Sequence, residues 1–115
     1  MSNLERKCPC EGGTLTRFIQ PVILSIFADE SMTAYSMIQE MENYEIFAKE
    51  RPDQAGVYRY IKRMASRGYL RKCASPNGEQ DFYEVTAKGL DCLSKWKKTL
   101  IEYQKDITSL IKEIK

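Results

Sequence analysis

The C-terminal part of the chain carries a long, regular repeat of apolar side chains. Successive members are separated by 3, 4, 3, 4, 3 and 4 positions, and they are Leu93, Trp96, Leu100, Tyr103, Ile107, Leu110 and Ile114. Because a seven-residue repeat keeps apolar side chains on one narrow stripe, this spacing predicts a long helix with a seam for a partner helix. We therefore expect paired C-terminal helices in a homodimer. The alternative is a long helix folded back on its own core.

Composition limits the classes of protein that the chain can represent. With 115 residues and 43% hydrophobic side chains, it suits one small domain whose modest core would gain from association. Histidine is absent and the six glycines are scattered, which excludes His-dependent catalytic sites and phosphate-binding loops. The N-terminus has no apolar leader, and the longest apolar run, residues 22–28, is too short to span a bilayer. We therefore expect a cytoplasmic protein that is not an enzyme, needs no cofactor and has no membrane partner.

Three shorter helices are predicted before this repeat. Pro21 suits a first helical position, and one helical face then carries Val22, Ile23, Ile26 and Phe27. Thr33 can cap a second helix, whose inward stripe is formed by Ala34, Met37, Ile38 and Met41. Asp53 can cap a third helix, which ends at Gly68 and turns inward Val57, Ile61 and Met64.

A hairpin is predicted between the third helix and the long C-terminal one. Residues 69–74 and 81–86 read as short strands, and Pro76, Asn77 and Gly78 between them favour a turn. Thr86 can then cap the last helix. The order of these elements predicts a mainly α fold with a small β-hairpin, namely a winged helix-turn-helix with a long C-terminal dimerisation helix.

Positive charge is concentrated in residues 54–78. This stretch carries no Asp or Glu although the whole chain has a net charge of only +2, and its cations are Arg59, Lys62, Arg63, Arg67, Arg71 and Lys72. Arg59, Lys62 and Arg63 fall opposite the inward stripe of the third helix. The second helix of a helix-turn-helix enters the major groove, so this face predicts contacts with double-stranded DNA. Arg67, Arg71 and Lys72 either contact DNA as well or keep the edge of the hairpin solvated.

Several segments in this order resemble the PadR family of winged-helix transcription regulators. They are "PVILSIFADESMTAYSMIQEM", "AGVYRYIKRMASRGYL" and "FYEVTAKG", and the likeness covers roughly residues 18–95. The resemblance implies a homodimeric repressor whose effectors are small, often aromatic compounds. Tyr35 and Tyr58 either pack at the edge of the core or, as the resemblance implies, contact phosphates. The family's His-Gly-Tyr triplet is here Thr33-Ala34-Tyr35, and the hairpin ends in Gln80 and Asp81 where relatives often have basic residues. We therefore expect the third helix to supply more of the DNA affinity than the hairpin.

The remaining candidates are Trp96 and the cysteines. Trp96 either packs at the seam or, beside its symmetry mate, stacks on a planar aromatic effector. Cys8 and Cys10 are too close to complete a tetrahedral zinc site alone, so we expect no metal, with a thiol or metal sensor as an alternative function. A protein-interaction module without base readout is the other alternative. The expected domains are an N-terminal arm (1–16), a DNA-binding domain (17–86) and a dimerisation helix (87–115).

Overall fold

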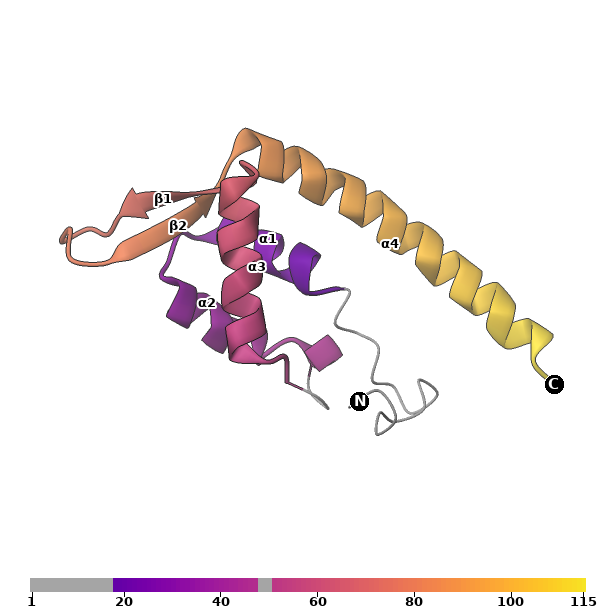
Figure 1. The fold of residues 1–115 in the computed structure, drawn as a ribbon. Helices are drawn as coiled ribbons and strands as arrows, with labels where there is room; N and C mark the ends of the chain where they lie inside the picture. Colours follow the sequence, from indigo (N-terminus) through magenta and orange to yellow (C-terminus); the bar gives the residue numbers. More distant parts are fainter. Residues whose placement is uncertain (1–17, 48–50) are drawn as a thin grey trace, which may run out of the picture.

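The computed structural model describes residues 18–47 and 51–115. Its elements follow the chain in this order: α1 (Ile19–Asp29), α2 (Ala34–Met41), the short 3-10 helix η4 (Glu45–Phe47), α3 (Gln54–Ser66), β1 (Leu70–Ala74), β2 (Asp81–Val85) and α4 (Ala87–Glu113). Figure 1 shows α3 across the front of α1 and α2, with the hairpin and α4 projecting to opposite sides. The predicted fold class is confirmed: the chain is a mainly α winged helix-turn-helix with one hairpin and a long C-terminal helix.

The helix starts follow the predicted caps, with one shift. The side chains of Thr33, Asp53 and Thr86 each accept a hydrogen bond from the backbone N–H three residues further on, at 3.0, 2.9 and 3.1 Å. The first helix begins at Ile19 instead of Pro21. Proline is tolerated at this point because the N–H groups of a first helical turn have no intrahelical partner.

The core lies where the first three helices meet the hairpin. Ile23 and Leu24 of α1, Met37 of α2 and Ile61 of α3 are fully buried, and Leu70 brings β1 onto the same cluster. The apolar stripes expected for the second and third helices are thus confirmed as core. Phe47 of η4 is also buried, a packing contact that the sequence pattern did not predict.

The hairpin is extended by a third backbone segment. β1 and β2 pair antiparallel, with Leu70 opposite Val85 and Lys72 opposite Tyr83. Tyr83 also exchanges two backbone hydrogen bonds with Met32, at 2.9 and 3.3 Å. The residues just before α2 are therefore bonded to the hairpin of β1 and β2, which is the wing of the fold, and this fixes its position relative to the helix-turn-helix.

Hydrogen bonds join the end of α3 to the start of α4. Gly68 has a φ of 88°, and the N–H groups of Gly68 and Tyr69 bond to the carbonyls of Ala65 and Met64, which is a Schellman cap. The hydroxyl of Thr86 donates toward the Gly68 and Tyr69 carbonyls. These contacts set the point at which the hairpin and α4 leave α3.

Only the first part of α4 packs on the core of its own chain. Leu93 and Trp96 are partly buried against the core, whereas the side chains from Leu100 to the end of the helix are exposed. Figure 1 shows this part of α4 running away from the other helices. Among the described residues, no helix combines the length and the apolar character needed to cross a bilayer.

Candidate nucleic-acid interface and apolar groove

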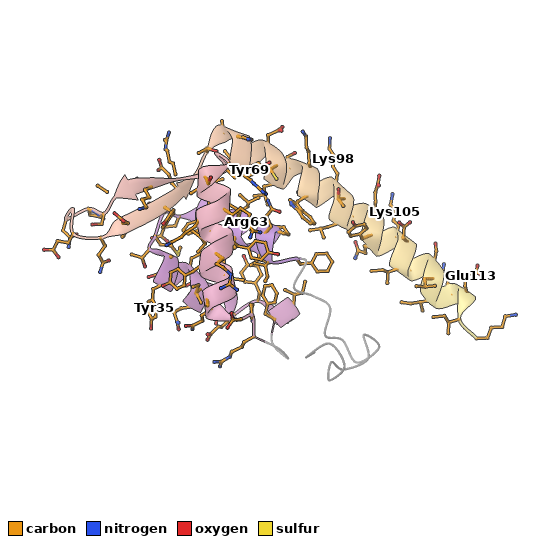
Figure 2. All side chains as sticks on the ribbon, in the orientation of Figure 1. Tyr35, Arg63, Tyr69, Lys98, Lys105 and Glu113 are labelled. Carbon is orange, nitrogen blue, oxygen red and sulfur yellow. The ribbon has the colours of Figure 1, made fainter. Side chains whose placement is uncertain are left out.

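The outer face of α3 is basic because the inner face is committed to the core. Val57, Ile61 and Met64 are buried at 1, 0 and 3% exposure, which turns Arg59 and Lys62 toward solvent. Arg63 is exposed too, and its guanidinium lies 5.8 Å from the centre of the Tyr60 ring. Figure 2 labels Arg63 on α3. The structure thus places all three predicted cations on the exposed surface of one helix.

These cations have no acidic partner within the described part of the chain. The ion pairs found among residues 18–47 and 51–115 join Arg51 to Glu42, Arg71 to Glu84, Lys72 to Asp81 and Lys95 to Asp91. Arg59, Lys62, Arg63 and Arg67 take part in none of these pairs. Their charges are therefore available to an external anion.

Two tyrosines that are far apart in the sequence line one hollow. Tyr35 on α2 is 62% exposed and Tyr58 on α3 is 38% exposed. The hollow has a volume of about 580 Å³, and its lining residues are Thr33, Ala34, Tyr35, Ser36, Tyr58, Gln80, Asp81 and Tyr83. The first turn of α2 also opens onto it, and helix N-termini favour anions. The structure therefore brings together two predicted phosphate contacts and one carboxylate.

The two cations of the wing differ from those of α3 because each is paired. Arg71 Nε donates to Glu84 Oε2 at 2.6 Å, and Lys72 Nζ lies 3.5 Å from Asp81 Oδ2. Both basic side chains are mostly exposed, so these contacts are surface ion pairs. The sequence alone did not show this pairing.

A large apolar groove runs between α1 and the exposed part of α4. Its volume is about 970 Å³; α1 contributes Pro21 and Val22, and α4 contributes residues including Trp96, Leu100 and Ile107. Tyr44 and Ile46 also line it. Figure 2 shows Lys98 and Lys105 on the side of α4 that faces away from the other helices. The groove is therefore the apolar side of an amphipathic helix, set against α1.

The exposed apolar surface of α4 is broader than the predicted seam. Leu100, Tyr103, Ile107, Leu110 and Ile114 are 36 to 68% exposed, as the seam prediction requires before a partner is added. Ile101 and Ile111 are also exposed, at 45 and 64%. Ile111 lies beside the seven-residue stripe, whereas Ile101 is turned about 100° round the helix from Leu100. The 3, 4 spacing predicted neither of them.

The described cysteines are not activated thiols. Burial raises the pKa of Cys73, and the nearby Glu84 carboxylate raises it further. Burial also raises the pKa of Cys92. No cluster of three or more His, Cys, Asp or Glu suited to a metal ion occurs within residues 18–47 and 51–115. Cys8 and Cys10, and the arm predicted for residues 1–16, lie outside the described residues.

Neither a protein-family model nor a curated protein matches the sequence, whereas solved structures do. A PadR-like transcriptional regulator from Bacillus cereus strain ATCC 14579 superposes with a TM-score of 0.73 at 20% identity, covering 84% of this chain and 94% of that one. A PadR family transcription regulator from Clostridium difficile R20291 gives a TM-score of 0.71 at 20% identity, covering 82% of this chain and 98% of that one. This likeness confirms at the level of fold the resemblance read from the sequence: the chain has the winged-helix fold of PadR-type regulators.

Proposed function

We propose that this protein is a sequence-specific DNA-binding regulator of transcription, a repressor that acts as a homodimer. The observation that carries the proposal is the outer face of α3, where Arg59, Lys62 and Arg63 are exposed and form no ion pair among the described residues. A helix in this position of a helix-turn-helix lies in the major groove, where cations meet phosphates and guanine edges.

The other DNA contacts are assigned by their position around α3. Arg67 follows α3 directly and extends its basic face. Tyr35 and Tyr58 line the hollow beside the first turn of α2, so their hydroxyls can donate to a backbone phosphate together with that turn. Lys72 is the weakest of these contacts because it is shared with Asp81.

The proposed dimer is formed by residues 87–115. The exposed apolar surface of α4 would otherwise remain in water, and it lies on one side of a helix whose opposite side carries Lys98 and Lys105. A second copy of α4 presents the same stripe and so matches it across a two-fold axis. Leu93 and Trp96 then belong to both the core of their own chain and the seam.

The groove between α1 and α4 is the proposed effector site. It is lined mainly by apolar side chains, and Trp96 offers a flat surface on which a planar aromatic compound can stack. A compound bound there would contact α4 of both subunits. It could thereby change the separation of the two α3 helices and release the repressor from DNA.

The proposed function is tested by selecting bound sequences from random double-stranded DNA with the purified protein. The expected result is an inverted repeat whose half-sites are about 34 Å apart along the duplex, since two α3 helices would enter successive major grooves. A protein-interaction module would bind no DNA at physiological salt. A thiol or metal sensor would bind DNA with an affinity that changes on oxidation or on addition of zinc.

A further inference from the structure

The wing carries more acidic than basic side chains. Residues 70–85 contain two cations, Arg71 and Lys72, and three acids, Glu79, Asp81 and Glu84, so their net charge is 2 − 3 = −1. The charged side chains on the outer face of α3, by contrast, are all cations. The two surfaces that a winged helix can turn toward DNA therefore differ in sign.

On one face of the hairpin, the strand register produces a close ion pair. Arg71 is directly opposite Glu84, and their side chains meet with Nε and Oε2 2.6 Å apart. Opposite charges on directly paired residues of an antiparallel hairpin attract each other. The guanidinium is thus turned toward a carboxylate of its own hairpin.

On the other face, a carboxylate lies at the hollow assigned to a phosphate. Asp81 lines the hollow that also holds Tyr35 and Tyr58. Its Oδ2 is 3.5 Å from Lys72 Nζ, and both side chains are mostly exposed. A phosphate entering the hollow would meet the Asp81 carboxylate, and Lys72 would have to leave Asp81 in order to help bind it.

We propose that Asp81 and Glu84 restrain the wing from binding DNA by pairing with Lys72 and Arg71, so that affinity depends mainly on α3. The inference rests on the proposed function. Like charges across an interface oppose binding. A cation that stays paired with a carboxylate does not neutralise a phosphate, so fewer counterions are released from the duplex. The wing therefore adds little non-specific affinity, and base contacts from α3 account for more of the total.

The variants Asp81→Asn and Glu84→Gln keep the shape of each side chain and remove its charge. Each is expected to tighten binding to a selected site and to random DNA by about 2-fold to 30-fold per dimer. This range is the contribution of two exposed ion pairs, one lost in each subunit, converted to a change in affinity. Each should also steepen the dependence of log affinity on log salt by up to about 2, one phosphate per subunit. The measurement is a salt titration by fluorescence anisotropy.

The matched control is Glu102→Gln, which makes the same change in net charge on the exposed surface of α4. It should leave affinity and salt dependence close to those of the original protein. If Asp81→Asn and Glu84→Gln behave like this control while the original protein binds DNA, the two acids do not restrain the wing. The proposed function would still stand. If the original protein binds no DNA, the proposed function itself fails.

A double-variant cycle tests whether the pairing itself is responsible. Lys72→Met in the original protein should weaken binding by less than it does in the Asp81→Asn background, because Asp81 already pairs with Lys72. In the Asp81→Asn background, Lys72→Met should remove most of the gain in affinity, since the released amine would then be the contact that was added. A gain that survives the loss of Lys72 would contradict the pairing. Thermal melts of all variants check that the fold is unchanged.

Discussion

The backbone carbonyl of Tyr69 lies against the α-carbon of Gly89, where the start of α4 crosses the end of the turn after α3. A Cβ built on Gly89 would overlap the Tyr69 carbonyl oxygen and come within 2.5 Å of Val85 Cγ2. Because one obstacle is backbone, it cannot move aside like a flexible side chain. The contact sets how closely α4 packs on the wing.

The variant Gly89→Ala should therefore destabilise the protein by about 1–3 kcal/mol, the usual cost of forcing an extra group into a packed site. The matched control is Gly56→Ala on α3, where the nearest atom to the added Cβ is Asp53 Oδ2 at 3.4 Å. Since alanine favours the helix, the control should stabilise the protein by about 0.4–1 kcal/mol. Urea denaturation followed by circular dichroism compares the two; equal stability changes would contradict this packing.

Replacing Leu100 and Ile107 together by Glu should abolish the dimer, because both side chains would place charges in the seam. The expected product is a folded monomer or an unfolded chain, with weak DNA binding in either case. Lys105→Glu, on the side of α4 that faces away from the other helices, is the control and should remain dimeric. Sedimentation velocity measures the mass. A monomeric original protein at micromolar concentration would refute the dimer.

Planar aromatic compounds should bind in the groove beside Trp96. Because Trp96 is the only tryptophan in the chain, binding should quench its fluorescence and raise the melting temperature. Trp96→Leu should weaken binding by removing the stacking surface while keeping an apolar side chain. If a broad panel of such compounds changes neither signal, Trp96 has a packing role alone.

The thiols of Cys73 and Cys92 should react slowly with iodoacetamide at neutral pH. Their pKa values are raised in the folded protein, chiefly by burial, so the reactive thiolate is disfavoured below the raised pKa and forms as the pH rises through it. Unfolding in urea should speed both reactions, because it returns each thiol to its ordinary pKa. Site-resolved mass spectrometry gives the rates. Faster alkylation in the folded protein than in urea would contradict the assignment.

Local sequence signals predicted most of the fold, and the failures have physical causes. Thr33, Asp53 and Thr86 cap their helices because capping depends on neighbouring residues alone. The bridge between Met32 and Tyr83 was missed because pairing of a single residue over a long sequence separation leaves no periodic pattern. The burial of Phe47 was not predicted either, because no periodic pattern in the sequence marks that position.

At the candidate interface, exposure was easier to predict than partners. Helical periodicity correctly placed Arg59, Lys62 and Arg63 on the exposed side of α3. Periodicity did not reveal that Tyr35 and Tyr58 line one hollow, since that depends on the packing of α2 against α3 and the wing. It also gave no sign of the Arg71–Glu84 pair, which depends on strand register.

If the cations of α3 bind the DNA, a salt titration of Arg59→Ala, Lys62→Ala and Arg63→Ala will show it. If a dimer neutralises about 6–10 phosphates, affinity of the original protein should fall about 10³-fold to 10⁵-fold between 50 and 200 mM salt. Loss of a phosphate contact should weaken all sequences alike and flatten the slope by about 2 per dimer, whereas loss of a guanine contact should cost about 1–3 kcal/mol at one base pair. Lys98→Ala, on the outer side of α4, should match the original protein. If the original protein and all three α3 variants bind a selected site and random DNA with the same affinity, the assignment of α3 as the recognition helix is wrong.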